Sequence, residues 1–207
     1  MEAPVSEGEP SIDIAWLRRR FAESRPQAES IYGDHGTRPG ADKLHAASVL
    51  VPIVARTPAP TVLFTQRTAH LKNHSGQISF PGGRAEQSDA GPEETALRET
   101  REEVGLQADR IEVLGRLPEY HTRTGYRVTP VVGIVFPPFD LHPDANEVAE
   151  AFEVPLAFLL DERNLQRHTR EFEGAERHFF AIPYGERYIW GATAGMLVNL
   201  ARYLTSE

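Results

Sequence analysis

One segment carries the signals for both ends of an α-helix, and it constrains the fold more than any other part of the sequence. Pro92 suits the first helical position, and Gly105 suits the left-handed conformation in which many helices end. Glu93 and Glu94 suit the positive N-terminal end of the helix dipole. The pattern therefore predicts a helix over residues 93–104.

The spacing along this helix separates a packing face from a charged face. At about 100° per residue, the packing face consists of Ala96, Leu97, Thr100 and Val104. Glu99 lies beside both Glu102 and Glu103 on a different side, and like charges at this spacing destabilise a helix. Arg98 can hold one of these carboxylates but cannot balance three. The cluster favours a hard divalent cation such as Mg²⁺ or Mn²⁺, which takes oxygen ligands.

The rest of the chain mixes strand and helix patterns. Apolar and β-branched runs typical of strands occupy residues 47–54, 61–66, 78–80, 111–117, 128–136, 178–182 and 188–190. Further helices are predicted over residues 12–23, with Ser11 as N-cap, and over residues 155–160 and 192–204. Strands and helices in mixed order predict a layered α/β or α+β domain.

Composition argues against several classes of protein. The chain has 207 residues, no Cys and a formal net charge of −8. Without Cys it has no disulfide, thiolate metal site or Cys nucleophile, and its negative charge argues against a broad nucleic-acid-binding surface. Residues 1–10 do not resemble a signal peptide and are expected to form a flexible tail. The longest apolar runs are about ten residues, short of the roughly 20 that span a bilayer, so we expect a cytoplasmic protein.

The charge is unevenly distributed along the chain. Residues 86–103 hold seven acidic and two basic residues, a net charge of −5. Residues 140–176 hold ten acidic and three basic residues, a net charge of −7, so the remainder is +4. The remainder can therefore receive an anion.

A glycine turn, Phe80-Pro81-Gly82-Gly83-Arg84, comes shortly before the carboxylate helix. Glycine lets backbone amides or carbonyls approach an ion or a phosphate closely. Together with the carboxylates and an arginine, the turn makes phosphate chemistry the leading hypothesis.

The segment from Gly83 to Leu106 resembles the Nudix box, whose general form is G-x5-E-x7-R-E-U-x-E-E-x-G-U, with U aliphatic. The residues from Arg98 onward match its second half at every position except Thr100, where an aliphatic residue is usual. The first half is one residue longer than the general form and lacks the usual Glu. An Asp in such a lengthened loop, here Asp89, is similar to the coenzyme A pyrophosphatase branch of the family.

A motif just upstream is similar to a second signature of the same branch, roughly L-L-T-x-R-S followed by G-x-V/I-x-F-P-G-G. The matching residues are Leu63-Phe64-Thr65-Gln66-Arg67-Thr68 and Gly76-Gln77-Ile78-Ser79-Phe80-Pro81-Gly82-Gly83. The resemblance implies the α/β/α sandwich of the Nudix family, with a mixed central sheet and a catalytic loop-helix-loop. It divides the chain into a tail (1–10), a helix and loop (11–45) and a Nudix hydrolase domain (46–207).

The resemblance implies metal-dependent hydrolysis of a diphosphate, with Mg²⁺ or Mn²⁺ as cofactor. For this branch the small-molecule substrate is coenzyme A or a derivative, and the products are 3′,5′-ADP and 4′-phosphopantetheine or its acyl form. The resemblance implies that Glu99, Glu102 and Glu103 bind the metal and that Arg98 orients one of these carboxylates.

The sequence leaves several candidates for the general base and for substrate contact. The base is a box glutamate such as Glu102, or else Glu147 or Glu150 of the acidic segment. Arg67 leads the candidates for diphosphate contact, because a guanidinium suits bidentate phosphate recognition. The other substrate-binding candidates are Lys72, Gly82, Gly83, Arg84 and Arg123. Trp190 is expected to pack in the core, and the alternative is that it shapes the pocket together with the loop from Thr122 to Tyr126.

Alternatives of the same and of another class stay open. The same chemistry fits ADP-ribose or another nucleoside diphosphate derivative. A non-catalytic nucleotide sensor is the alternative of another class, and the intact carboxylate set argues against it. Decapping of nucleic acid is disfavoured by the net charge and the lack of a basic stripe. The sequence allows a monomer or a homodimer.

Overall fold

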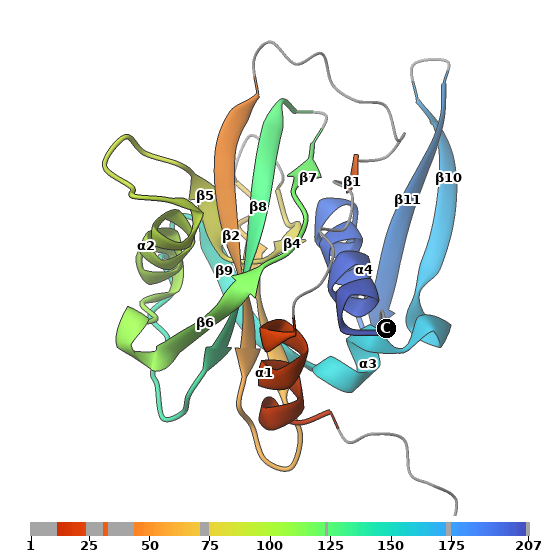
Figure 1. Cartoon of the computed structure of the whole chain (residues 1–207). Coiled ribbons are helices and arrows are strands. Elements are labelled where there is room, and N and C mark those ends of the chain that lie inside the picture. The colour runs from red at the N-terminus through yellow and green to blue at the C-terminus, as the bar shows by residue number, and fades with distance from the viewer. Residues whose placement is uncertain are drawn as a thin grey trace, which may run out of the picture.

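The computed structural model describes residues 12–23, 31–32, 44–70, 75–122, 124–172 and 175–205, and a mixed β-sheet forms its centre (Figure 1). Nine strands within these residues belong to the sheet. They are β1 (Ile31–Tyr32), β2 (His45–Val54), β3 (Thr61–Arg67), β4 (Ile78–Ser79), β5 (Gly82–Arg84), β6 (Ile111–Arg116), β7 (Tyr120–His121), β8 (Tyr126–Val135) and β9 (Val148–Pro155). Their order is β1-β7-β8-β2-β3-β4, with β5 beside β2, β6 beside β8 and β9 beside β3.

Two long strands, β2 and β8, organise this sheet. They pair in parallel over their full lengths, and both are buried along most of their residues. Parallel strands that are covered on both faces need nearly continuous apolar sequences. This requirement explains why the runs at residues 47–54 and 128–136 predict these two strands correctly.

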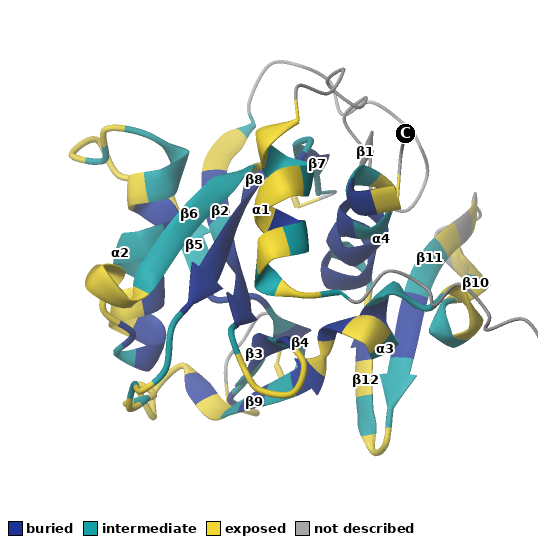
Figure 2. Cartoon of the chain, turned by 60° about the horizontal axis from the view of Figure 1, so that its bottom comes forward, coloured by how far each residue is buried: buried dark blue, intermediate teal, exposed yellow. Residues whose placement is uncertain are grey.

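Helices cover both faces of the sheet (Figures 1 and 2). They are α1 (Ile14–Ala22), α2 (Pro92–Val104), α3 (Leu156–Leu160) and α4 (Ala192–Thr205), with single 3₁₀ turns at Ala108–Arg110 and Glu162–Asn164. α2 lies on one face, and α1 and α4 lie on the other (Figure 1). The predicted α+β architecture with a mixed central sheet is therefore confirmed. None of the helices in the described part of the chain has the length and apolarity needed to cross a membrane.

A smaller antiparallel sheet lies beyond α4 (Figure 1). Its strands are β10 (Gln166–Phe172), β11 (Ala175–Tyr184) and β12 (Arg187–Trp190). Side chains alternate between the two faces of a strand, and the paired residues Ile182 and Ile189 are buried in the core with Leu197 of α4. The opposite face of β12 carries Tyr188 and Trp190, which are exposed.

The main sheet divides the apolar core. On the α4 side, a large cluster includes Phe64 and Leu197, and Figure 2 shows the buried residues along α4 in dark blue. On the α2 side, Ala96 packs against Leu50 and Val131 of the sheet. Small and apolar residues on one face thus hold α2 against the strands.

The start of α1 differs from the sequence-based expectation. The helix begins at Ile14 and its N-cap is Asp13, whose carboxylate accepts a hydrogen bond from the backbone N–H of Trp16 at 2.7 Å. Ser11, the expected cap, lies outside the described residues, as does the predicted tail over residues 1–10.

Two long strands, β9 and β10, escaped the sequence-based prediction, as did the short strands β1, β5 and β7. β9 occupies part of the acidic segment, where Glu150 interrupts the alternation of apolar residues. β10 has no large apolar residue before Phe172. β9 pairs with β3, and β10 pairs with β11. β9 therefore depends on a partner far away in the sequence, whereas β10 forms a hairpin with the next strand although its own sequence is polar.

Candidate active site

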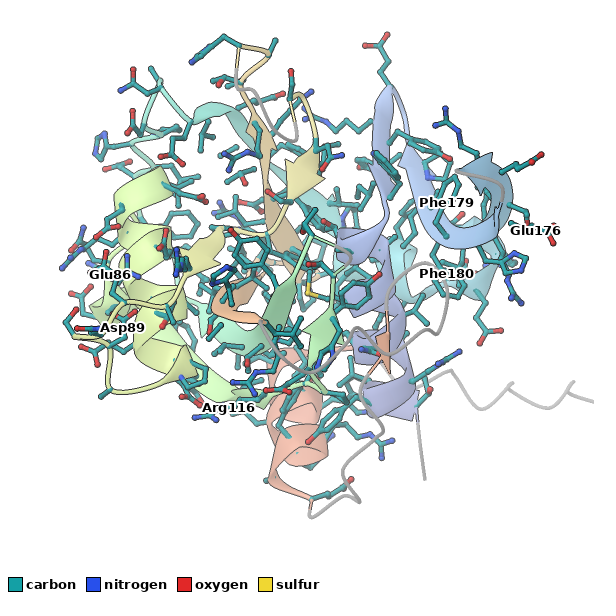
Figure 3. The ribbon with its side chains drawn as sticks, turned by 90° about the horizontal axis from the view of Figure 1, so that it is seen from above. Glu86, Asp89, Arg116, Glu176, Phe179 and Phe180 are labelled. Carbon is teal, nitrogen blue, oxygen red and sulfur yellow. The ribbon has the colours of Figure 1, made fainter. Side chains whose placement is uncertain are left out.

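The three helix glutamates, which we call the carboxylate cluster (Glu99, Glu102 and Glu103), differ widely in burial. Glu103 is 7% exposed, whereas the side chains of Glu99 and Glu102 are 18% and 52% exposed. A solvated helix face would leave all three in water. α2 instead directs two of them toward the glycine turn, and Arg116 of β6 fixes its first turn through an ion pair with Glu93 (Figure 3).

Thr100, which stands where an aliphatic residue is usual, does not disturb the packing of α2. It is fully buried, and its hydroxyl donates to the carbonyl of Ala96 at 2.6 Å. This bond to the preceding turn satisfies the hydroxyl within the helix. The packing face therefore stays intact despite the departure from the family pattern.

Arg98 is the centre of a network of charged groups. Its side chain is 14% exposed and donates to Asp89 through Nε at 3.0 Å and Nη2 at 3.1 Å. Nη1 donates to Glu99 at 2.9 Å and to Glu102 at 3.0 Å. Nη2 also donates to the carbonyl of Arg84 at 3.1 Å. The predicted orienting contact of Arg98 is thus made to two carboxylates at once.

Asp89 fixes Arg98 from the opposite side. Its side chain is 4% exposed and accepts hydrogen bonds from the N–H of Glu86 at 2.9 Å and the hydroxyl of Thr95 at 2.8 Å. Figure 3 labels Glu86 and Asp89 in the loop beside α2. Hydrogen bonding to Arg98 holds the pKa of Asp89 well below its usual range. The candidate site residues named from sequence omit Asp89, although its place in the lengthened loop was a signal.

The glycine turn brings backbone against the carboxylate cluster. A Cβ on Gly82 would lie 2.4 Å from the carbonyl oxygen of Ser48, so only glycine fits between β2 and β5. A Cβ on Gly83 would lie 2.5 Å from the carboxylate of Glu99. The N–H of Gly82 donates to Glu103 at 3.3 Å. Both glycines therefore serve close approach, as their sequence context predicts.

Burial perturbs the carboxylate cluster. The pKa of Glu103 is raised to about 7, chiefly because burial disfavours its charged form. The N–H of Gly82 and the charge of Arg67 oppose this shift, and the charges of Glu147 and Glu99 add to it. The pKa of Glu99 is also raised by burial, against the influence of Arg98. The cluster and Glu147 are thus close enough to feel one another's charge.

Arg67 lies between the carboxylate cluster and a cavity. Its Nη1 is 4.0 Å from Oε1 of Glu103, and its buried Nε has no hydrogen-bond partner among the described residues. The residue ends β3 at an irregularity in the pairing with β9. A guanidinium with an unused donor beside a cavity is suited to bind an anion.

The cavity lies on the α4 side of the sheet and has a volume of about 350 Å³. Val49, Ile78 and Met196 contribute apolar walls, and Arg67 and Gly82 also line it. The last two residues contact Glu103 as well. The cavity and the carboxylate cluster therefore meet at Arg67 and Gly82.

The structure separates the two acidic-segment candidates for the base. The loop before β9 is tied to α2 by a hydrogen bond from the N–H of Asp144 to the carbonyl of Glu103 at 2.9 Å. The carbonyl of Glu147 accepts from the N–H of Thr68 at 2.9 Å, so this residue is held beside the end of β3. Glu150 instead pairs with Arg187 at 2.7 and 3.0 Å.

Some of the other predicted site residues do not lie at the carboxylate cluster or the cavity. Arg84 is exposed, does not line the cavity, and has Nη2 3.3 Å from Nδ1 of His45. Lys72 and Arg123 lie outside the described residues. The expectation that Trp190 packs in the core is wrong, because Trp190 is 39% exposed and lines the cavity.

The donors of the carboxylate cluster suit a hard divalent cation, because they are all carboxylate oxygens and two of the three are partly or largely removed from water. In the described part of the chain, no three acidic or histidine side chains stand arranged around a common ion position. The carboxylates of Glu99 and Glu102 accept hydrogen bonds from Arg98, and the carboxylate of Glu103 accepts one from the N–H of Gly82. The residues that could hold a metal are therefore these three glutamates, with Glu147 nearby.

Comparison with known proteins identifies the family. A family model described as the NUDIX domain matches residues 44–182. Nudix hydrolase NudL of Escherichia coli K12 is 41% identical over 191 residues, which cover 92% of this chain and 94% of that protein. NudL of Pectobacterium atrosepticum is 42% identical over 170 residues, which cover 78% and 83% of the two chains. The chain therefore belongs to the Nudix hydrolase family.

Solved structures include a similar member of this family. The Nudix hydrolase RenU of M. smegmatis has a TM-score of 0.47 and 27% sequence identity, over 55% of this chain and 71% of that chain.

Replacing the charge of Asp89 tests its hold on Arg98. Asp89→Asn keeps the size of the side chain but removes the charged, two-pronged acceptor, so the metal-free protein should unfold at a lower urea concentration. Glu86→Gln is the matched control, because Glu86 is 61% exposed and its Oε1 is 4.0 Å from Nη1 of Arg98. Equal urea midpoints for the two variants would show that Asp89 does not organise the network.

The buried charge of Glu103 predicts a pH-dependent gain of stability in Glu103→Gln. The folded protein binds the Glu103 proton up to about pH 7, whereas the unfolded chain releases it near 4.5, so ionisation destabilises the fold as the pH rises between these values. Without metal, Glu103→Gln should be more stable than the wild type at pH 8, and the difference should shrink toward pH 5. Urea unfolding in EDTA measures this.

Glu102→Gln supplies the control for loss of a carboxylate from the same helix at a position that is 52% exposed. A Glu103→Gln protein that is less stable than the wild type at pH 8 would mean that attraction to Arg67 outweighs the cost of burial.

Proposed function

We propose that this Nudix hydrolase is a divalent-metal-dependent pyrophosphohydrolase that cleaves the diphosphate of coenzyme A and its derivatives. The products are 3′,5′-ADP and 4′-phosphopantetheine or its acyl form. One observation carries the proposal: the carboxylate cluster and the cavity meet at Arg67 and Gly82, so a diphosphate bound by Arg67 would lie beside the glutamates.

The choice of coenzyme A is supported by where the upstream motif lies. In sequence, the motif covers residues 63–68 and 76–83. In the fold, its residues Arg67, Gln77, Ile78, Ser79, Phe80 and Gly82 line the cavity. The signature that resembles the coenzyme A branch therefore forms one wall of the candidate substrate site. The adjoining apolar residues suit the pantetheine arm.

Different residues of the chain would bind the diphosphate, hold the metal and accept a proton. Arg67 binds and orients its oxygens through charge-assisted hydrogen bonds. Glu99, Glu102 and Glu103 would hold Mg²⁺ or Mn²⁺, which when bound polarises phosphoryl oxygens and shields their negative charge. Arg98, held by Asp89, keeps Glu99 and Glu102 in place. Glu147 accepts the proton of the attacking water.

A substrate comparison tests the proposal. Purified protein with Mg²⁺ should hydrolyse coenzyme A faster than ADP-ribose, as followed by separation of the nucleotide products. Glu103→Gln should lower kcat by about 100-fold or more, since a metal contributes several kcal/mol and ~1.4 kcal/mol corresponds to a tenfold change.

The possible outcomes separate the alternatives. Faster turnover of ADP-ribose than of coenzyme A would identify ADP-ribose as the better substrate and reject the coenzyme A assignment. Tight nucleotide binding without turnover of either compound would support a sensor. Unchanged turnover in Glu103→Gln would refute the assignment of the carboxylate cluster as the metal site.

A matched pair of variants tests the general base. Glu147→Gln should lower kcat by about 100-fold or more, within the usual range for a lost general base. Glu150→Gln should stay within a few-fold of wild type, because the Glu150 carboxylate is engaged by Arg187 and the resulting hydrogen bond lowers its pKa. Steady-state kinetics on coenzyme A provides the comparison. The reverse order of effects would assign the base to Glu150.

A further inference from the structure

An aromatic face covers the outer side of the small sheet. It consists of His168, Phe179, Tyr188 and Trp190. His168 stacks on Phe179 with ring centroids 5.4 Å apart, and Phe179 contacts Trp190 at 5.8 Å with the ring planes at 69°. Figure 3 shows Phe179 on β11, on the side of the molecule away from α2.

The two aromatic residues of β12 are unusually open to solvent. Tyr188 and Trp190 are 43% and 39% exposed, and they are the large apolar residues that stand exposed in the described part of the chain. Among the described rings Trp190 contacts Phe179, in a T-shaped arrangement, and 39% of Trp190 stays exposed. The indole therefore has a π-surface available to a planar ligand.

Trp190 also belongs to the cavity that contains Arg67. The chain passes from Trp190 through Gly191 and Ala192 into Thr193 of α4, and all four residues line the cavity. Trp190 is thus at the rim, with one part in the cavity wall and another on the aromatic face. Tyr188, two residues earlier, is on the same face of β12 but does not line the cavity.

The size of the cavity limits what it can enclose. About 350 Å³ is near the lower end of the roughly 300–1,000 Å³ typical of sites for drug-sized ligands. Coenzyme A is larger than such ligands, so one end of it must lie outside. The apolar interior suits the flexible pantetheine arm, and a flat base suits an exposed indole.

We propose that Trp190 is the stacking platform for the adenine base of the substrate. The inference rests on the proposed function, because it assigns the two ends of coenzyme A to two parts of one site. Arg67 holds the diphosphate at the carboxylate cluster, the pantetheine arm fills the cavity, and the adenine lies on Trp190 at the rim. Stacking of a base on an aromatic side chain needs no base-specific hydrogen bond.

Competition by the two halves of the substrate tests this arrangement. The inhibitors are 3′,5′-ADP, which carries the base, and 4′-phosphopantetheine, which does not. Trp190→Ala should weaken inhibition by 3′,5′-ADP on the order of tenfold, as expected for a lost stacking contact. Inhibition by 4′-phosphopantetheine should weaken much less, because Trp190 forms only the rim of the cavity that takes the pantetheine arm.

Two further variants control for general disturbance of β12. Trp190→Phe, which keeps an aromatic surface, should restore most of the affinity for 3′,5′-ADP. Tyr188→Ala, which removes an exposed aromatic residue of the same strand, should leave both inhibition constants unchanged. Equal weakening of both inhibitors by Trp190→Ala, weakening of 4′-phosphopantetheine alone, or no effect on either would overturn the proposal.

A binding measurement separates this inference from the choice of substrate. The chain has two tryptophans, Trp16 of α1 and Trp190, so Trp16→Phe leaves Trp190 as the sole indole fluorophore. In this variant, checked for an unchanged melting temperature, 3′,5′-ADP should quench the fluorescence strongly, and 4′-phosphopantetheine, which meets Trp190 only at the cavity rim, should quench it much less. If Trp16→Phe destabilises the protein, the wild type and Trp190→Ala are compared instead. Quenching by 3′,5′-ADP that occurs in the wild type and is lost in Trp190→Ala then shows that the base contacts Trp190.

The results for turnover and for quenching are independent. Quenching by 3′,5′-ADP without hydrolysis of coenzyme A would leave the stacking platform standing while the proposed function fails. Hydrolysis of coenzyme A without quenching would leave the function standing and reject Trp190 as the platform.

Discussion

Holding several carboxylates together out of water is costly, and the way in which α2 does so determines the arrangement of the site. Arg98 neutralises part of the negative charge, because its guanidinium binds Glu99 and Glu102 directly. Asp89 holds this guanidinium in place. Glu103 is left with the N–H of Gly82 and a guanidinium 4.0 Å away. Its pKa is raised because that compensation is incomplete. A site with surplus buried negative charge favours an added cation.

The fold supplies the support that this arrangement needs. Ala96 packs α2 against Leu50 of β2 and Val131 of β8, while Gly82 packs against the backbone of β2. The helix and the turn are thus fixed to the same strand from two directions. The short distance between Gly83 and the carboxylate of Glu99 follows from this common support. A side chain at either glycine would have to displace backbone or the carboxylate.

Local signals in the sequence predicted α2, β2, β3 and β8, because caps and apolar runs act over a few residues. They missed β9, which is stabilised by pairing with the distant strand β3, and β10, a polar strand that pairs with the next strand of the chain, β11. For the site, spacing predicted that Glu99 and Glu103 share a side of α2, but not that Glu103 is buried. Burial of Glu103, exposure of Trp190 and the engagement of Glu150 by Arg187 all depend on contacts across the fold.

The elements that carry the family chemistry and those that shape the cavity are largely distinct. The carboxylate cluster and Arg98 belong to one helix on one face of the sheet. The cavity lies on the other face and is lined by residues of several strands, among them β2, β3, β8 and β12, and of α4. Arg67 and Gly82 are the described residues that contact Glu103 and line the cavity. Changes in β12 or α4 can therefore alter what the cavity accepts without moving the carboxylates. On the proposed function, this separation explains how a common hydrolytic helix can be combined with a substrate as long as coenzyme A.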